Sequence, residues 1–302
     1  MPFARTSPAA LIHVLALVLG LSGCTVLPGG GSSYVKEDGV WSYRQSHGWD
    51  GSDTSAVRGA DPMTFQVIDS IYAKDRRSVY YRGKLLPGAD PESFSVVSES
   101  AGGAIGADGN VVFCAAERLE GSHPASFALL SDGYAKDANR VYYFCNGVPD
   151  ADPATFGRVG RYWQDRAHVY HLGKRVEGLD PRHLVQHENK AWAWNDSVAC
   201  VEVSCLRPDD IASFRAVRGV YARDRLSWYA AESGVDPRKM AVIDPASFVV
   251  IDDYWARDRT TMYWTGRPLA GVNPDTFEII SAYKGKASGA CYDAGKKTPG
   301  NC

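Results

Sequence analysis

Four histidines are the first residues in this sequence whose type and spacing could support chemistry. His183 and His187 lie four residues apart, a spacing that on a helix would place two imidazoles on one face, as in a metal-binding pair. The surrounding pattern instead predicts a short capping turn at His183 and a strand at His187, so the rings would not converge. His168 and His171 flank an apolar pair on another predicted strand. We expect all four to be core or rim residues, with no metal or other cofactor.

A recurring aspartate could form a row of acids, but its position favours a structural role. Each copy precedes a short polar segment and then an apolar or aromatic pair, the pattern of a turn between two strands. An aspartate side chain bonds the turn amides that follow it. No Gly-x-Ser-x-Gly motif predicts a serine nucleophile. The recurring residues are Asp75, Asp137, Asp165, Asp196, Asp224 and Asp258.

Tryptophans offer a second kind of candidate site. Exposed indole rings on tandem hairpins could stack against sugars or cationic head groups. The alternative is that these rings fill the spaces between repeated units and contact no ligand. The candidates for ligand stacking are Trp163, Trp192, Trp194, Trp255 and Trp264.

The sequence contains seven cysteines, and six of them follow the N-terminal region. An even number in an exported chain predicts disulfides, although six cysteines allow fifteen pairings. Proximity in the sequence favours pairing each with its nearest neighbour, and no Cys-x-x-Cys motif suggests a metal site instead. The expected pairs are Cys114 with Cys145, Cys200 with Cys205, and Cys291 with Cys302.

The N-terminus has the features of an export signal. Arg5 precedes an apolar run over residues 11–21, which is too short to span a bilayer comfortably. Leu-Ser-Gly-Cys at residues 21–24 resembles the bacterial lipobox, which implies cleavage after residue 23 and acylation of Cys24. An ordinary secretory signal is the alternative. Thr25 replaces the aspartate usual for inner-membrane retention, so we expect an outer-membrane lipoprotein, with residues 24–33 as a lipidated Gly/Ser-rich tether.

The remaining chain is organised as an internal repeat. The motif Asp-Pro-x-(Ser/Thr)-Phe occurs at residues 61–65, 90–94, 152–156 and 244–248, and variants begin at residues 123, 180, 210 and 273. Successive starts are therefore 29, 33, 29, 28, 30, 34 and 29 residues apart. A second motif, Tyr-Ala-(Lys/Arg)-Asp followed by an aromatic pair, lies within each unit, with degenerate copies centred on Asp108 and Asp196.

Each unit predicts a capping turn and two or three short strands. Four and five residues after the turn aspartate, consecutive positions are both apolar or aromatic, so this strand must be covered on both faces. A unit of about 29 residues requires stacked neighbours to do that. The sequence thus predicts an all-β fold of about seven hairpin or three-stranded repeats with partial end units. Either an open solenoid or a closed propeller-like ring is compatible with this pattern.

The segment Lys-Asp-Ala-Asn-Arg-Val-Tyr-Tyr at residues 136–143 resembles the DKNYY family of bacterial repeat proteins. The resemblance extends over residues 34–286, and residues 287–302 would form a disulfide-bonded tail. Several copies depart from the family pattern, because another residue occupies the position of its lysine. The family implies this architecture without an assigned activity, and no catalytic residue carries over. The departures are Arg76, Ala138, Arg166, Arg225 and Arg259.

The leading functional hypothesis is a non-enzymatic lipoprotein that presents a binding or scaffolding surface to an envelope protein or polysaccharide. An envelope glycan-acting hydrolase is the alternative, with acids on variable segments such as Glu117, Glu120, Asp209 or Asp210. A passive spacer is a third possibility. The formal net charge of −2 and the lack of a basic run make nucleic acid an unlikely partner.

Replacing Cys24 with alanine tests the predicted anchor. Because the thiol is the acylation site, we expect the variant to leave the membrane fraction and to lose the mass of the acyl chains. Fractionation and intact-mass measurement check both. A variant that stays in the membrane fraction and shows no lost acyl mass would contradict lipidation at Cys24.

Overall fold

The fold was analysed in a computed structural model, which describes residues 31–98, 104–186, 191–232, 234–298 and 302. Within these ranges the regular structure consists of short antiparallel strands and single turns of 3-10 helix. None of the described helices is long and apolar enough to cross a membrane. The predicted signal peptide, Cys24 and most of the tether lie outside the described residues.

The strands form nine sheets, which we call units 1 to 9 in chain order. Unit 1 has three strands, units 2 to 9 have four each, and neighbours in sequence are neighbours in each sheet. The strands are β1 (Ser33–Glu37), β2 (Val40–Ser46), β3 (Ser52–Ala56); β4 (Gln66–Val67), β5 (Tyr72–Lys74), β6 (Val79–Tyr81), β7 (Lys84–Leu85); β8 (Ser95–Ser98), β9 (Ile105–Ala107), β10 (Val112–Cys114), β11 (Glu117–Leu119); β12 (Ala128–Leu129), β13 (Tyr134–Lys136), β14 (Val141–Tyr143), β15 (Asn146–Gly147); β16 (Gly157–Val159), β17 (Tyr162–Gln164), β18 (Val169–His171), β19 (Lys174–Arg175); β20 (Val185–Gln186), β21 (Trp192–Trp194), β22 (Ala199–Val201), β23 (Ser204–Leu206); β24 (Arg215–Arg218), β25 (Tyr221–Arg223), β26 (Trp228–Glu232), β27 (Val235–Lys239); β28 (Val249–Val250), β29 (Trp255–Arg257), β30 (Met262–Trp264), β31 (Arg267–Leu269); β32 (Glu278–Ile279), β33 (Lys284–Ala287), β34 (Ala290–Asp293) and β35 (Lys296–Thr298).

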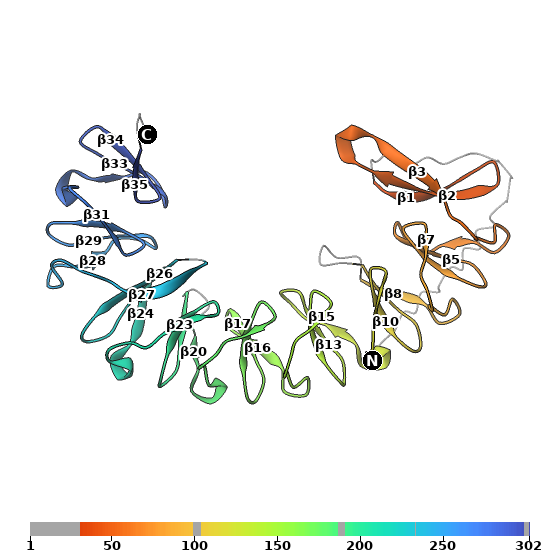
Figure 1. The fold of residues 1–302 in the computed structure, drawn as a ribbon, viewed down its shortest axis with the longest axis horizontal. Coiled ribbons are helices and arrows are strands. Elements are labelled where there is room, and N and C mark those ends of the chain that lie inside the picture. The colour runs from red at the N-terminus through yellow and green to blue at the C-terminus, as the bar shows by residue number, and fades with distance from the viewer. Residues whose placement is uncertain (1–30, 99–103, 187–190, 233, 299–301) are drawn as a thin grey trace, which may run out of the picture.

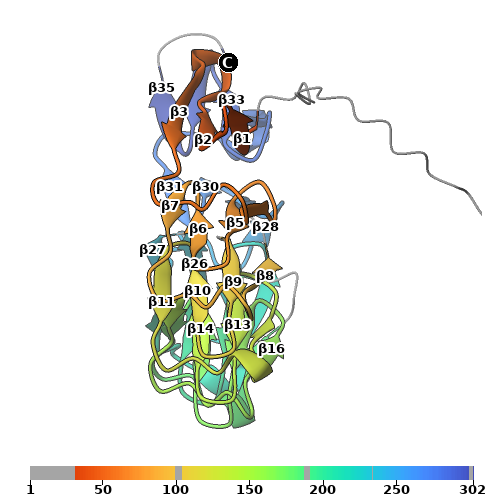
Figure 2. The ribbon, with the colours of Figure 1, turned by 90° about the vertical axis from the view of Figure 1, so that its right-hand side faces the viewer.

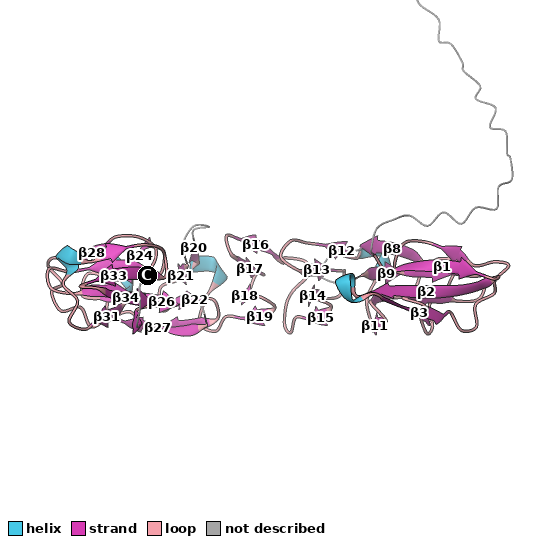
Figure 3. Ribbon diagram, turned by 90° about the horizontal axis from the view of Figure 1, so that it is seen from above, coloured by secondary structure: helices cyan, strands magenta, loops and turns pink. Residues whose placement is uncertain are grey.

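The units stack into an open arc. Figure 1 shows units 1 and 9 at opposite tips, so of the two architectures compatible with the sequence, the described chain has the open one. From above, the units follow one another in a single row (Figure 3). Figure 2 shows the four strands of unit 3 side by side across the width of that row. All-β tandem repeats are therefore the architecture of the described chain.

Two details differ from the sequence prediction. Each complete unit has a fourth strand, such as β7, which at two residues is too short to give a recognisable sequence pattern. The repeat also continues past residue 286, because β34 and β35 complete the sheet of unit 9. The segment expected to be a tail is thus largely part of the last unit.

A buried aspartate holds the turn between the second and third strands of most units. In unit 7, one carboxylate oxygen of Asp224 accepts the amides of Leu226 (2.8 Å) and Ser227 (2.6 Å). The other accepts the amide of Asp210 (2.9 Å) and the hydroxyl of Tyr229 (2.7 Å). The side chain thereby ties its own turn to the capping turn and to the next strand. The predicted structural role of the recurring aspartate is confirmed for Asp75, Asp137, Asp165, Asp224 and Asp258, which make the same four bonds.

Unit 6 differs, and the sequence alignment there was wrong by one residue. Asn195, and not Asp196, occupies the turn position: its carbonyl oxygen accepts the amides of Ser197 (2.9 Å) and Val198 (3.0 Å). Cys200 then stands where the other units have the bonding tyrosine, and it pairs with Cys205 on β23. Asp196 is exposed and forms an ion pair with His183. A disulfide therefore stands in for the carboxylate–tyrosine bond in this unit.

The Asp-Pro motif forms a turn that leads into each sheet. Asp61 shows the predicted capping pattern, since its carboxylate accepts the amide of Met63 (3.1 Å) and the hydroxyl of Thr64 (3.0 Å). Arg76, one of the departures from the family pattern, pairs with Asp61 at 3.1 Å. The variant copies form 3-10 helices instead, η2 (Pro124–Ser126), η3 (Pro181–His183), η4 (Ile211–Ser213) and η5 (Pro274–Thr276), and η1 (Gly48–Asp50) lies in unit 1.

Aromatic rings join each unit to the next. Phe94, at the end of the motif of unit 3, lies 5.2 Å from the ring of Tyr72 in unit 2 and 6.1 Å from Phe113 in its own unit. The same arrangement recurs along the arc, for example at Phe248 between Tyr221 (6.3 Å) and Tyr263 (5.3 Å). Both faces of the third strand are covered, as the sequence predicted. Each such contact contributes about 0.5–1.5 kcal/mol beyond simple burial.

Asp224→Ala should be strongly destabilising. It leaves three backbone amides and one hydroxyl without a partner in a buried turn, so we expect a loss of about 3 kcal/mol or more, measured by urea unfolding. Asp196→Ala is the matched control, because Asp196 is exposed one position beyond the turn residue of unit 6. It should change the stability by less than about 0.5 kcal/mol. Equal effects of the two would contradict the proposed role of the turn carboxylate.

The turn carboxylates should also make stability depend on acid pH. Burial alone would raise the pKa of Asp258, but its bonds from Tyr263 and from the Thr260 and Asp244 amides outweigh this and lower it to about 2. The pKa values of Asp75, Asp137, Asp165 and Asp224 are lowered for the same reason. Stability should therefore be full above about pH 4 and fall toward about pH 2, by about 2 kcal/mol for Asp258 alone.

Melting temperatures measured by circular dichroism from pH 6 to pH 2 check this dependence. The variant Asp258→Asn, which keeps the shape of the side chain but does not titrate, should show a shallower fall. A melting temperature that is constant over this range would show that the carboxylates are not preferentially charged in the folded state.

Candidate functional site

The two rims of the arc differ in construction. Figure 1 shows the 3-10 helices that precede the sheets on the outer rim. The aspartate turns bond to these capping turns and so lie on the same rim. Because the strands are antiparallel, the hairpins that join first to second and third to fourth strands lie on the inner rim. The inner rim is therefore the concave side.

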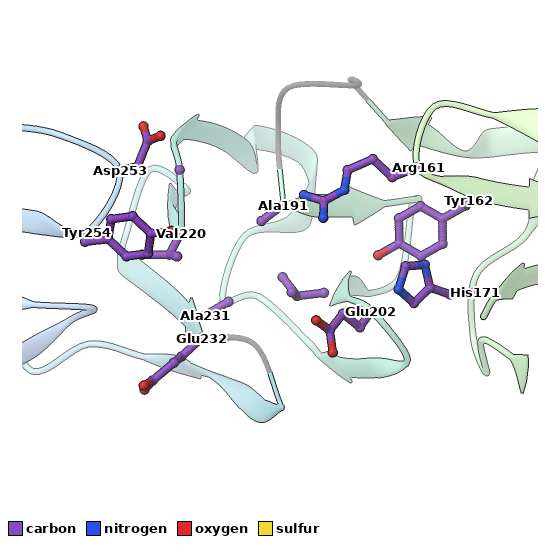
Figure 4. Close-up of a pocket in the computed structure, with 12 residues that line it drawn as sticks. Arg161, Tyr162, His171, Ala191, Glu202, Val220, Ala231, Glu232, Asp253 and Tyr254 are labelled. Atoms are coloured by element: carbon purple, nitrogen blue, oxygen red, sulfur yellow. The ribbon is translucent and has the colours of Figure 1, made fainter. Parts of the chain in front are cut away.

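The concave side is hollowed across units 5 to 8. The depression there has a volume of about 280 Å³. Its polar lining comes from all four units, and Figure 4 shows Arg161, Tyr162 and His171 of unit 5 at one end. Glu202 of unit 6 lies beside them, and Glu232 and Asp253 lie at the other end. The floor is formed by small apolar side chains, Ala191, Val201, Val220 and Ala231.

A small residue at one repeated position contributes to the hollow. The residue paired with the first residue of the second strand is large in several units, as in Tyr81, Tyr143 and Trp264. In unit 6 this position is held by Val201, which lines the depression. The space filled by an aromatic ring in those units is therefore open at unit 6 on the concave side.

In units 2, 5 and 8, a glycine at the hairpin between the third and fourth strands lets the unit approach its predecessor. Gly83 and Gly173 have positive φ, and a Cβ at either would lie within 2.6 Å of a tyrosine in the preceding unit. Their amides donate to the hydroxyls of Tyr34 (3.0 Å) and Tyr134 (2.7 Å). Unit 6 has Val203 at this position, and a valine side chain needs the space that glycine leaves free. The usual amide bond from unit 6 to unit 5 is therefore absent from the described bonds.

As a result, the hydroxyl of Tyr162 has no hydrogen-bond partner in the structure, although only 1% of the residue is exposed. Equivalent polar groups all reach the following unit. Tyr72 donates to Ala104 (3.2 Å), Trp192 to Val220 (3.0 Å), and Tyr221 to Tyr254 (2.7 Å). Burial raises the pKa of Tyr162, and the backbone amide of Glu202 acts in the opposite direction. The hydroxyl is thus protonated, and its proton has no acceptor in the structure.

The charges of the depression are balanced. Glu232 pairs with Arg267 at 3.3 Å, and Asp253 pairs with Arg218 at 3.2 Å, both at the unit 7 and 8 end. Burial lowers the pKa of His171, whose ring lies 5.1 Å from that of Tyr162, so the imidazole is neutral at pH 7. Arg161 makes no ion pair within the described part of the chain.

The tryptophan prediction is corrected by the structure. Trp192 and Trp255 are fully buried, and Trp163 and Trp264 are 6% and 5% exposed. Trp194 is partly buried, with its ring 5.5 Å from that of Phe214. These rings fill the spaces between units, the alternative that the sequence had left open. Trp163, Trp192, Trp194, Trp255 and Trp264 are therefore not a stacking surface for a ligand.

The predicted cysteine pairs all form in the structure. Cys114 on β10 bonds Cys145 after β14, which fastens unit 3 to unit 4. Cys200 and Cys205 join adjacent strands of unit 6, and Cys291 holds Cys302 against unit 9.

The histidines and the acids considered as candidates lie apart in the structure. His183 pairs with Asp196 on the outer rim, and His187 lies outside the described residues. No group of three or more histidine, cysteine or acidic residues capable of holding a metal occurs among the residues that the structure describes. The hydrolase candidates lie in different units, with Glu117 and Glu120 at β11 and Asp209 and Asp210 before β24.

The depression itself was not predicted from the sequence. Its signal was present in two features of unit 6, the small residue Val201 and the valine at residue 203. An alignment of the units by their paired strands shows both, whereas the alignment that took Asp196 as the turn residue of unit 6 displaced them by one position.

Comparison with known proteins identifies a family for this chain. No curated protein and no solved structure matches this chain significantly. The DKNYY family model matches it twice, over residues 30–117 and 108–291, which together span units 1 to 8 and the start of the last hairpin of unit 9. This chain therefore belongs to the DKNYY family.

Proposed function

We propose that this protein is a lipid-anchored envelope protein whose concave side binds a partner in the envelope. The observation that carries the proposal is the depression across units 5 to 8, which combines an unpaired buried hydroxyl, an unpaired guanidinium and a carboxylate on one surface. The polar residues of the repeat itself are used in the turns. Glu232 and Asp253 of the depression bridge units 7 and 8 through ion pairs, whereas the hydroxyl of Tyr162 and the guanidinium of Arg161 have no such use in the described structure.

Compartment and anchor support this reading. Three disulfides within the described chain suit an oxidising compartment such as the periplasm or the cell surface. The lipobox sequence ending at Cys24 supplies an address on a membrane, and we place the protein at the outer membrane. An envelope protein or a cell-wall component is the partner class that such a position makes available.

The exposure and ion pairing of the acidic residues in the depression favour binding over the hydrolase alternative. A general acid normally requires a desolvated carboxyl group. Asp253 is exposed and Glu202 and Glu232 are only half-buried, and two of these three are in ion pairs with arginine. Release of reducing ends from peptidoglycan or an envelope polysaccharide, abolished by Glu202→Gln, would replace the binding proposal with a catalytic one.

Capture by the soluble mature domain, residues 25–302, tests the proposal. Immobilised protein should retain a specific component from solubilised envelopes, and the double variant Arg161→Ala, Glu202→Ala should lose at least about tenfold of that capture. The matched control is Arg166→Ala, Asp196→Ala, which removes one arginine and one acid from the same two units on the outer rim. Equal capture by both variants would show that the concave depression is not the binding surface.

A further inference from the structure

The end of the depression in unit 5 is a cluster of hydrogen-bond donors. Tyr162 presents a buried hydroxyl that lacks a partner, although the equivalent groups of the other units are bonded. Arg161 precedes it in sequence and lines the same end, with no ion pair among the described residues (Figure 4). Two donors at one opening are an environment that suits a carboxylate.

The opposite side of this opening has the reverse character. Glu202 contributes a carboxylate, which accepts bonds from an ammonium or hydroxyl group. Glu232 and Asp253 are paired with Arg267 and Arg218, and Arg161 adds a positive charge at the unit 5 end of the lining. A site with separated charges of both signs complements a ligand of the same kind.

We propose, as a more specific form of the proposed function, that the depression binds a small zwitterion, an amino acid or a dipeptide. Its carboxylate accepts hydrogen bonds from Arg161 and Tyr162, and its ammonium group lies at Glu202. Its side chains rest on the floor of Val201, Val220 and Ala231. At about 280 Å³, the hollow has room for two small amino-acid residues.

A sugar suits this site less well. Sugar rings commonly stack on an exposed aromatic face, and the ring of Tyr162 is buried. The other aromatic residue of the lining, Tyr254, packs at 5.5 Å against Tyr283. The depression thus offers paired charges and no free aromatic platform.

Dialanine is the probe, used with the soluble mature domain in isothermal titration calorimetry. The free dipeptide should bind, and its C-terminal amide and N-acetyl forms, which each lack one charge, should bind about tenfold more weakly or worse. In Arg161→Ala the difference between the free and amidated forms should shrink, because the carboxylate has lost its charged partner and keeps only the hydroxyl of Tyr162. Equal binding of all three forms to the unaltered domain would overturn the proposal.

Both stereochemical forms should be compared, because zwitterionic dipeptides in the envelope come from two sources. Preference for the L,L form indicates protein-derived peptides, and preference for the D,D form indicates cell-wall peptides. Either preference supports the assignment. Binding of chitotetraose with no binding of dialanine would replace the zwitterion with a sugar.

Tyr162→Phe separates a ligand-binding role from a structural one. Because the hydroxyl has no partner in the free protein, its removal should leave the melting temperature unchanged while weakening dialanine binding about three- to tenfold. Tyr72→Phe is the matched control, since its hydroxyl donates to Ala104 in the next unit, and it should lower the melting temperature without affecting binding. A fall in melting temperature for Tyr162→Phe equal to that for Tyr72→Phe would show that the hydroxyl has a structural partner.

The two proposals fail in different ways. If envelope capture depends on Arg161 and Glu202 but dialanine does not bind, the concave binding surface stands and the zwitterion assignment is wrong. If dialanine binds and no envelope component is captured, the site is a small-molecule site and the proposed macromolecular partner is wrong.

Discussion

The buried carboxylate at the turn between the second and third strands is the interaction on which the other features of the arc depend. Strands of two to five residues, the lengths found in units 2 to 9, make too few ladder bonds to fix their own geometry. Asp224 and its equivalents supply the missing constraint by accepting three amides and a hydroxyl from three segments of the unit. With that turn fixed, the aromatic residues on the two faces of the third strand have defined directions in which to meet their neighbours.

Different kinds of contact join the units at the outer rim, in the middle and at the inner rim. On the outer rim the Asp-Pro turns and their capping bonds set the entry to each sheet, and in the middle phenylalanines pack between aromatic rings of adjacent units. On the inner rim glycine allows backbone and ring to approach closely. At the junction of units 5 and 6, where Val203 stands in place of glycine, the units still stack through their centres but the hydroxyl of Tyr162 is left without a partner. The candidate site therefore lies where the repeat is least regular.

The regular part of this structure could be predicted from the sequence, and the irregular part could not. Motif spacing predicted the units, the two-sided burial of the third strand and the structural role of residues such as Asp75. Proximity predicted the cysteine pairs, since stacked units keep sequence neighbours together in space. The sequence could not tell whether the tryptophans are buried or exposed, because a ring between units and a ring on the surface would recur at the same repeat spacing. Openness of the arc depends on small rotations summed over nine units, which no single motif encodes.

Unit 6 occupies the middle of the concave site and is held by a bond of a different kind. Asn195 carries no proton that could titrate, and the Cys200–Cys205 bridge replaces the tyrosine contact. The units around it depend on charged carboxylates and are therefore weakened by acid, whereas unit 6 is weakened by reductants. The turn of unit 6, which lies within the candidate site, should therefore be stable in acidic surroundings. In a reducing compartment its disulfide would be lost. The structure of the site should thus depend on export of the chain to an oxidising compartment.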